Sequence, residues 1–490
     1  MSLDVRVRGG VLRGLRESGI AVFRGVPFAA PPVGRDRLRA PRPPSAWDGV
    51  RPAAQFGPPP PQPDLFGHGA PAGVAGDEWL TVNVWTPDPD PAAKLPVMVW
   101  IHGGGYTIGR SGLPQYDGGH LARDGNVVVV TFNYRVGFEG FGHVPGAPPN
   151  RGLLDQVALL EWVRDDIAAF GGDPARVTIF GESAGGGSVA ALLAMPSAAG
   201  LFRGAVAQSV AGTFFTPELA ADIAAELWPD IVDPDHAPRP FVPDPPATGT
   251  APDRWGPAGF RSILFAPVVD GDILPRTPWE ALAAGASRDV VLIAGHTRDE
   301  HRLFDVLGGQ PAPITPEQAR AALDRIAPGP DGARRYREAY PQAGPGLLHE
   351  LVFSDWLFRM PGARLAEAHT GRSYLYELTW PAPGFGGALG ACHGLDVPLV
   401  FGNLTAGQPG LLIGTEPGPD AVALSQRMRS AWTGFAATGD PGWPAYTRDE
   451  RLTQVFDTRD AVTTYPEISS LRIWADAAFL LSLRPSEDFD

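Results

Sequence analysis

Short, continuous apolar runs alternate along the chain with longer stretches in which apolar residues recur every three or four positions. The apolar runs of strand length occupy residues 97–101, 127–132, 177–180 and 290–294, and a further strand is expected over residues 373–380. An unbroken apolar run of this length is typical of a strand that is buried on both faces, as in a parallel sheet. The alternation therefore predicts an α/β fold in which helices cover both faces of a mostly parallel, twisted sheet.

The clearest helical pattern spans residues 153–170, where apolar side chains recur at three- and four-residue steps. That spacing gives a helix one apolar face. Gly171-Gly172-Asp173-Pro174 ends the pattern, and the strand at 177–180 follows almost at once. We therefore expect an amphipathic helix that leads directly into a buried strand.

Proline-rich stretches at residues 58–61, 238–246 and 381–383 separate the periodic segments. The residue before a proline is disfavoured in a helix, so these stretches are interpreted as loops. They lie inside one fold unit in this interpretation, and we expect a single domain over residues 1–490 with helical and loop insertions.

Composition narrows the class of protein. Apolar residues make up 44% and charged residues 19%, as in a globular chain, and no apolar stretch approaches the ~20 residues that span a bilayer. With 54 acidic against 40 basic residues, the net charge of −14 disfavours a nucleic-acid partner.

The 61 glycines and 54 prolines suggest a bacterium with a GC-rich genome. Cys392 is the single cysteine, and the charged N-terminus does not match an export signal, so we expect a cytoplasmic protein.

One motif has the form of a nucleophile turn. Gly181-Glu182-Ser183-Ala184-Gly185 stands directly after the strand at 177–180 and before a helical run at 186–195. A serine hydroxyl is a weak nucleophile, so it has to project from a sharp turn where a base can reach it. The flanking glycines lack the Cβ atoms that would collide in such a turn. The alternative is a chance match in a glycine-rich chain.

A second glycine motif, His102-Gly103-Gly104-Gly105-Tyr106, follows the strand at 97–101. Loops of this type supply backbone N–H groups to an oxyanion hole, because glycines let the main chain approach the reacting oxygen. A phosphate loop is the alternative, but neither the Lys-Ser/Thr pair nor a complete G-x-G-x-x-G follows. The two motifs, in this order, favour acyl-transfer chemistry.

In this arrangement the base and its orienting acid are expected C-terminal to Ser183, with the acid before the histidine. His393 follows the strand at 373–380 by a loop and is the best candidate for the base. His349 and His369 belong to helical stretches and are interpreted as surface residues.

Asp299 and Glu300 are both candidates for the acid, because the loop after the strand at 290–294 carries them side by side. Residue spacing does not rank one above the other. Asp270 is a third option, although its Asp-Gly sequence is more typical of a turn.

The sequence resembles the type-B carboxylesterases, the family of bacterial para-nitrobenzyl esterases and animal cholinesterases. The shared segments, in order, are residues 23–34, 80–87, 102–105, 181–186, 297–300, 393–394 and 435–441. The resemblance implies an α/β-hydrolase fold with insertions around an active-site gorge. It also maps the acid of the triad onto Glu300 and the oxyanion donors onto the amides of Gly104, Gly105 and Ala184.

The chain departs from the family at several positions. Pro60 and Trp79 stand where the family has its N-terminal disulfide, so that bridge is absent. Residues 62–78 include no tryptophan where a choline-binding aromatic residue is usual, which disfavours a cholinesterase. His301 replaces the glycine that usually follows the acid, and it is interpreted as a solvent-facing residue or as a neighbour of the acid. The segment 215–265 is shorter than in relatives, which would thin the wall over the acyl side.

The expected function is hydrolysis of an uncharged small-molecule ester through an acyl-enzyme intermediate. His393 would take the proton of Ser183, and Glu300 would orient the imidazole. No cofactor is expected, and no metal site, because His296 and His301 do not share a helical face. Two alternatives stay open: the same site redirected to lactonisation, cyclisation or acyl transfer in secondary metabolism, and a non-catalytic binding protein. The presence of both serine and histidine argues against the second.

Overall fold

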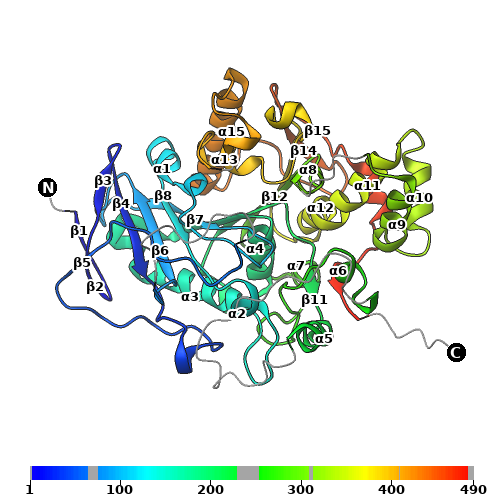
Figure 1. Ribbon diagram of the computed structural model, residues 1–490. Helices are drawn as coiled ribbons and strands as arrows, with labels where there is room; N and C mark the ends of the chain where they lie inside the picture. The colour runs from blue at the N-terminus through cyan, green and yellow to red at the C-terminus, as the bar shows by residue number, and fades with distance from the viewer. Residues whose placement is uncertain (1–2, 65–75, 229–252, 308–312, 408, 484–490) are drawn as a thin grey trace.

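The central sheet dominates the computed structural model, which describes residues 3–64, 76–228, 253–307, 313–407 and 409–483. Within these residues the sheet has 11 strands in the order β15-β14-β13-β12-β10-β9-β7-β8-β6-β4-β3 (Figure 1). The strands are β3 Leu15–Glu17, β4 Ile20–Pro27, β6 Thr81–Thr86, β7 Leu95–Ile101, β8 Val128–Phe132, β9 Gly172–Glu182, β10 Gly204–Gln208, β12 Val291–Thr297, β13 Ser373–Leu378, β14 Leu452–Phe456 and β15 Ala461–Thr464.

All neighbouring strands from β14 across to β8 run parallel, so the predicted mostly parallel sheet is confirmed. Both ends of the sheet are antiparallel, where β3, β4 and β6 follow β8 and where β15 follows β14. The sequence pattern did not predict these ends, because their strands alternate less clearly or lie outside the apolar runs.

Strand β7 shows why an unbroken apolar run forms a central strand. Val97, Val99 and Ile101 belong to one hydrophobic cluster, whereas Met98 and Trp100 belong to another. Successive side chains of a strand point to opposite faces, so the two clusters lie on the two faces of the sheet. Every residue of β7 is therefore buried.

Helices cover both of these faces (Figure 1). α3 Arg151–Asp166 and α4 Ala184–Ala194 pack into the cluster of Val97, whereas α13 Asp396–Phe401 and α15 Pro419–Thr438 pack into the cluster of Trp100. The other helices are α1 Gly119–Gly125, α2 Gly137–Phe141, α5 Pro217–Leu227, α6 Pro257–Phe260, α7 Pro278–Ala283, α8 Arg302–Leu307, α9 Pro316–Ile326, α10 Gly332–Ala339, α11 Pro345–Ser354, α12 Met360–Ala368, α14 Pro409–Leu412 and α16 Ile468–Ile473. No described helix has the length and hydrophobicity that a membrane crossing requires.

The helix predicted over residues 153–170 forms in two parts. α3 ends at Asp166, and a 3₁₀ turn over Ile167–Phe170 completes the apolar face. Gly171 then ends the helix with a φ of 83°, and a Cβ atom there would lie 2.0 Å from the carbonyl oxygen of Asp88. Only glycine fits this position, which explains why the pattern stops where it does.

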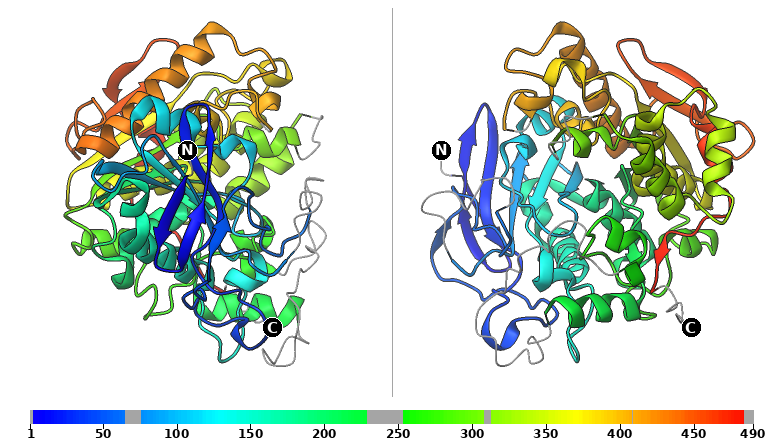
Figure 2. Two further views of the ribbon diagram at one scale, coloured as in Figure 1. Left: turned by 90° about the vertical axis from the view of Figure 1, so that its left-hand side faces the viewer. Right: turned by 45° about the vertical axis from the view of Figure 1, so that its right-hand side comes forward.

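Two smaller sheets lie outside the main one. β1 Asp4–Val7, β2 Gly10–Arg13 and β5 Val50–Pro52 form a sheet at one end of the molecule, drawn in blue in Figure 2. β11 Phe214–Phe215 pairs with β16 Leu480–Leu481, which brings a segment near the C-terminus beside the middle of the chain.

The predicted proline-rich loops are confirmed at residues 58–61 and 381–383, where neither helix nor strand forms. The third, at 238–246, lies outside the described residues, and so does much of the tryptophan-free stretch 62–78 and of the short segment 215–265. The single domain over residues 1–490 stays a prediction.

Candidate active site

Ser183 lies at the turn between β9 and α4, with a φ of 60° and a ψ of −122°. This is a strained backbone conformation for a residue with a side chain, and such strain persists only where the surroundings enforce it. A Cβ atom on Gly181 would lie 2.6 Å from the carbonyl oxygen of Gly185, and one on Gly185 would lie 2.0 Å from that of Ile101. The two glycines are therefore what allows the turn to present the serine.

The glycine loop after β7 packs directly against this turn. A Cβ atom on Gly103 would lie only 3.1 Å from the Cβ of Ser183. Gly104 and Gly105 have positive φ values of 118° and 60°, and their N–H groups have no acceptor among the described residues. The amide of Ala184 is the first of α4, so the helix itself offers it no partner. The glycine loop and the first amide of α4 thus flank the turn at Ser183, and the oxyanion role of Gly104, Gly105 and Ala184 stays a prediction.

His393 lies between two carboxylates. Its Nδ1 is 2.6 Å from Oε2 of Glu300, and its Nε2 is 3.1 Å from Oε1 of Glu182. The ring also stacks on Phe358, with 4.1 Å between the ring centroids. Glu182 directly precedes Ser183, so Nε2 of His393 contacts a side chain of the turn between β9 and α4.

Glu300 is completely buried and its second oxygen is also occupied. Oε1 accepts hydrogen bonds from Ser209 Oγ at 2.7 Å and from the amide of Thr297 at 2.9 Å. Burial alone would raise the pKa of Glu300, but the charge of His393 and the hydrogen bonds from His393 and Ser209 hold it below its usual value. Glu300 is therefore an anion in the folded protein.

The charge around His393 favours its protonated form. Burial acts to lower the pKa of His393, but Glu182 and Glu300 outweigh burial and raise it to about 9. Burial raises the pKa of Glu182, which is held between His393 and the carboxylates of Asp396 and Glu300.

Asp299, unlike Glu300, has a backbone amide and two arginines as its partners, and not the imidazole of His393. Its Oδ2 accepts the amide of Ala391 at 2.8 Å, and the guanidinium groups of Arg298 and Arg302 pair with the same carboxylate. Asp299 therefore ties the end of β12 to the loop that carries His393, whereas the neighbouring Glu300 contacts the imidazole itself. Asp270, the third candidate, accepts the amides of Asp272 and Leu274 within its own turn.

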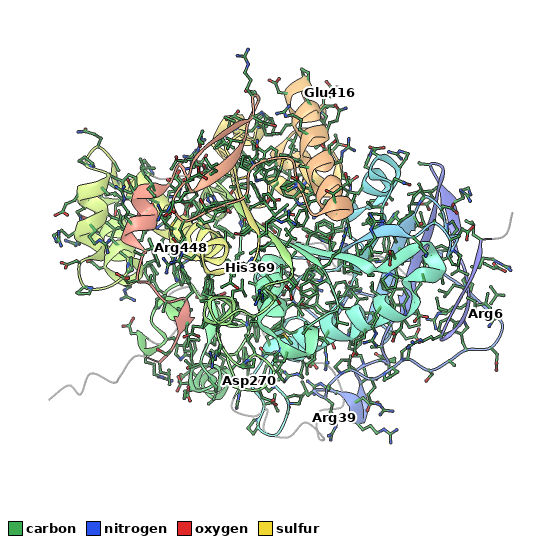
Figure 3. The ribbon with its side chains drawn as sticks, turned by 180° about the vertical axis from the view of Figure 1, so that it is seen from behind. Arg6, Arg39, Asp270, His369, Glu416 and Arg448 are labelled. Atoms are coloured by element: carbon green, nitrogen blue, oxygen red, sulfur yellow. The ribbon has the colours of Figure 1, made fainter. Side chains whose placement is uncertain are left out.

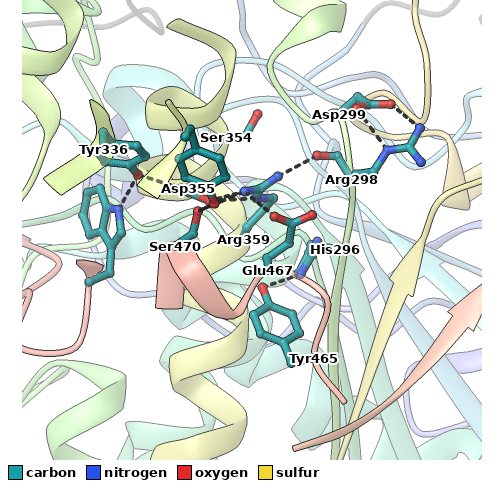
Figure 4. Close-up of polar contacts among 12 residues, drawn as sticks. His296, Arg298, Asp299, Tyr336, Ser354, Asp355, Arg359, Tyr465, Glu467 and Ser470 are labelled. Carbon is teal, nitrogen blue, oxygen red and sulfur yellow. Dashed lines mark hydrogen bonds and ion pairs between the residues drawn. The ribbon is translucent and has the colours of Figure 1, made fainter. Parts of the chain in front are cut away.

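A network of charged side chains contacts the loop that carries Asp299 and Glu300 (Figure 4). Arg359 donates from Nη1 to the carbonyl oxygen of Arg298 at 3.1 Å. Its Nε donates to Asp355 at 2.8 Å, and its Nη2 lies 3.2 Å from Glu467. Arg359 is itself buried, so removing one partner would leave an uncompensated charge.

His349 and His369 are not the surface residues expected from sequence, and of the two interpretations of His301 the solvent-facing one is wrong. His369 is buried, and its Nε2 is hydrogen-bonded to the carbonyl oxygen of Ser287. His369 and Arg448, both labelled in Figure 3, line one pocket. His349 is partly buried, with its side chain 12% exposed. His301 is fully buried and stacks on Phe353. The surface assignments of His349 and His369 were wrong because helix periodicity does not reveal which face of a helix another element covers.

Two contacts of the site were missed by sequence reasoning, those of Glu182 and Ser209. Glu182 occupies the variable position of the G-x-S-x-G motif, and its side-chain direction depends on the strained turn. Ser209 directly follows β10, so strand order was the available signal for its approach to Glu300.

The parallel sheet, the serine on the turn between β9 and α4 and the histidine-carboxylate pair at the carboxyl ends of neighbouring strands are the features of an α/β-hydrolase. The family model described as "Carboxylesterase family" matches residues 2–227. The para-nitrobenzyl esterase of Bacillus subtilis (strain 168) is 37% identical over 94% of this chain and 96% of its own. The phenmedipham hydrolase of Pseudarthrobacter oxydans is 36% identical over 90% and 92%.

Solved structures give the same assignment. Carboxylesterase EST55 of Geobacillus stearothermophilus superposes with a TM-score of 0.82 at 35% identity, over 96% of this chain and 99% of that one. The chain belongs to the carboxylesterase family and is a carboxylic ester hydrolase with the α/β-hydrolase fold.

Proposed function

We propose that the protein hydrolyses uncharged carboxylic esters, with Ser183 as nucleophile, His393 as general base and acid, and Glu300 as the carboxylate that orients the imidazole. The observation that carries the proposal is the position of His393. Nδ1 is held by Glu300 at 2.6 Å, and Nε2 lies 3.1 Å from Oε1 of Glu182, the residue directly before Ser183. A histidine held in this way has the tautomer that accepts a hydroxyl proton.

In the first half of the reaction, Nε2 of His393 takes the proton of the Ser183 hydroxyl while Oγ attacks the ester carbonyl carbon. The carbonyl π electrons move to oxygen and form a tetrahedral oxyanion. When the intermediate collapses, the C–O bond to the alcohol breaks and the imidazolium gives its proton to the leaving alkoxide. The products of this half are an alcohol and an acyl-serine ester.

In the second half, water repeats the attack. His393 removes a proton from water, the hydroxide oxygen bonds to the acyl carbon, and collapse returns the proton to Ser183 Oγ as the carboxylic acid leaves. Throughout, buried Glu300 stays ionised and stabilises the imidazolium. The amides of Gly104, Gly105 and Ala184 would stabilise the oxyanion in both halves, each by on the order of 3 kcal/mol.

Glu182, the second carboxylate beside His393, affects the protonation state of the imidazole before the reaction starts. Only the neutral imidazole can accept the serine proton, yet Glu182 and Glu300 raise the pKa of His393 to about 9. The two carboxylates therefore favour the protonated imidazole in the resting enzyme. Activity should rise with pH until His393 has lost this proton.

An uncharged substrate is favoured by the sequence and by the relatives. Residues 62–78 supply no tryptophan to hold a quaternary ammonium. The similarity to a para-nitrobenzyl esterase supports the same choice.

Hydrolysis of para-nitrophenyl acetate and butyrate tests the proposal, with Ser183→Ala as the matched control. The wild type should release para-nitrophenol and free acid, should be inactivated by a fluorophosphonate, and should lose this activity with the substitution. Equal turnover by the variant would exclude the mechanism. Recovery of a lactone or transferred ester instead of free acid, from a hydroxy ester, would favour the redirected chemistry over hydrolysis.

A further inference from the structure

A cluster of two imidazoles and one carboxylate lies beside the site and takes no part in the proposed mechanism. His301, Asp305 and His349 place one ligand atom each within 4.8 Å of one another. His301 and Asp305 are one helical turn apart at the start of α8, and His349 comes from α11. The cluster therefore joins two elements that are more than forty residues apart in the chain.

The distances are close to those of a tetrahedral metal centre. Oδ2 of Asp305 lies 3.3 Å from Nδ1 of His301 and 3.8 Å from Nδ1 of His349. Metal-ligand bonds of about 2.0 Å put tetrahedral ligands roughly 3.3 Å apart. The widest pair has to approach by a further ångström or so, and the partly exposed side chains of Asp305 and His349 can supply this movement.

The imidazoles lack other partners. His301 is fully buried, yet its Nδ1, the atom that faces Asp305, has no well-formed hydrogen bond among the described residues, and the same holds for Nδ1 of His349. His301 stacks on Phe353 with 4.5 Å between centroids, which fixes the plane of its ring. Buried polar atoms without partners are rare in native proteins and call for a missing ligand or ion.

We propose that His301, Asp305 and His349 bind one divalent transition-metal ion, with Zn²⁺ as the best match. Two imidazoles and one carboxylate are the donor set of three-ligand zinc sites, with a fourth position left to water. The inference does not rest on the ester-hydrolysis mechanism. It replaces the expectation that the chain has no metal site, which considered only His296 as a partner for His301.

Arg261 is the group that competes with a metal. Its guanidinium lies over the ring of Phe353 at 4.7 Å and exerts its charge on Asp305 and on both histidines. Its positive charge acts on the same three side chains that would hold a cation. Removing that charge should therefore strengthen metal binding, which is opposite to the effect expected from damage to the fold.

A metal ion bound by these three residues would also affect the structure next to Glu300 and His393. His301 directly follows Glu300, and Phe304 in the same turn lies 5.3 Å from the ring of His393. A metal ion would link this turn to α11 and hold it in place. Bound metal should then raise the thermal unfolding midpoint, because a ligand of the folded state stabilises it by mass action.

The test is titration of the protein, first dialysed against a chelator, with Co²⁺ and then with Zn²⁺. We expect one Co²⁺ per chain with the visible d–d absorption of a low-coordinate ion, displaced by Zn²⁺, and a raised unfolding midpoint. His349→Gln and Asp305→Asn should each weaken Co²⁺ binding by at least about tenfold. Loss of a residue that only supports a metal ligand already costs about tenfold or more in affinity, so loss of a ligand should cost at least as much. Arg261→Gln should tighten it.

His120→Gln is the matched control, because His120 and Asp124 repeat the same i,i+4 spacing on α1 at the surface and, within the described chain, form no three-residue metal cluster. It should leave Co²⁺ affinity unchanged. The absence of a saturable Co²⁺ band in the wild type overturns the proposal. So does equal affinity in wild type, His349→Gln and Asp305→Asn, since His349 and Asp305 are partly exposed and their loss is compatible with folding.

Discussion

The two halves of the candidate site are built from different materials. The nucleophile half consists of Ser183 and the amides of Gly104, Gly105 and Ala184, and its geometry follows from backbone conformation and from glycines that fit where a Cβ would collide. The acid-base half depends on side-chain charges, with His393 held between Glu300 and Glu182.

The difference explains where each half is vulnerable. A backbone donor cannot be deleted by changing a side chain, so the nucleophile half fails when its loop is forced to move. The acid-base half keeps its backbone when a carboxylate becomes an amide, and it fails through protonation and tautomer instead. Substitutions in the two halves should therefore leave different kinetic signatures.

The largest effect is expected for Ser183→Ala, which removes the one side chain on which the nucleophile half depends. Because a triad acts as a unit, kcat should fall by roughly 10⁶-fold with the fold intact. Single-turnover kinetics with para-nitrophenyl butyrate measure this. Retention of more than about a tenth of wild-type turnover would show that the nucleophile lies elsewhere.

Glu300→Gln tests the acid-base half with an isosteric change. The amide favours the wrong histidine tautomer, so kcat should fall by about 10⁴-fold while the circular dichroism spectrum is unchanged. Asp299→Asn is the neighbouring control and should reduce kcat much less, because Asp299 contacts the loop at Ala391 and not the imidazole. The opposite ranking of the two variants contradicts the assignment.

Gly104→Ala tests the nucleophile half through its backbone. A Cβ atom there would lie 2.1 Å from the carbonyl oxygen of Ile108, so the loop must move and one oxyanion donor is displaced. We expect a loss of about 10²- to 10³-fold in kcat. Gly271→Ala introduces similar positive-φ strain, at 83°, where no atom lies within 4 Å of the new Cβ, and it should leave kcat unchanged. Similar losses in both variants would trace the effect to stability alone.

Glu182→Gln tests whether the second carboxylate sets the pH range. Wild-type kcat/KM should rise with pH up to about 9, because the reactive imidazole is the neutral one and Glu182 and Glu300 outweigh burial to raise the pKa of His393. With one carboxylate removed the acid limb should move to lower pH by roughly one unit. Glu338→Gln, on the exposed face of α10, should leave the limb in place. An unmoved limb in Glu182→Gln contradicts the charge argument.

The raised pKa of His393 also makes the stability of the fold depend on pH. A histidine that is more basic in the folded state stabilises the fold fully below about pH 6.5, and this contribution is lost as pH rises through about 9. The unfolding free energy of Glu182→Gln should therefore approach that of the wild type at high pH more closely than at pH 6.

The smallest effect concerns charge on the substrate. Without a tryptophan in residues 62–78, butyrylcholine should gain little over its uncharged 3,3-dimethylbutyl analogue in kcat/KM. A preference for the cation above about tenfold, or 1.4 kcal/mol, would reveal an aromatic cage that the sequence does not indicate.

The nucleophile half of the candidate site could be predicted from the sequence more fully than the acid-base half. The turn at Ser183 and the loop of Gly104 depend on neighbours a few residues away, so local motifs and the apolar runs of β7 and β9 were sufficient to predict them. The choice between Asp299 and Glu300 depended on the resemblance, because it requires the register between β12 and β13. The approach of Glu182 to His393 and of His349 to His301 depends on strand order and helix packing, which leave no local pattern.

The most direct test of the account is active-site labelling with a fluorophosphonate, followed by peptide mass spectrometry. We predict one adduct per chain, on Ser183 in the peptide that contains Gly181 to Gly185, formed in proportion to the loss of esterase activity. Labelling should be absent in Ser183→Ala and slowed in Glu300→Gln. A stoichiometric adduct on another residue, or full labelling of the Ser183→Ala variant, would contradict the proposed triad.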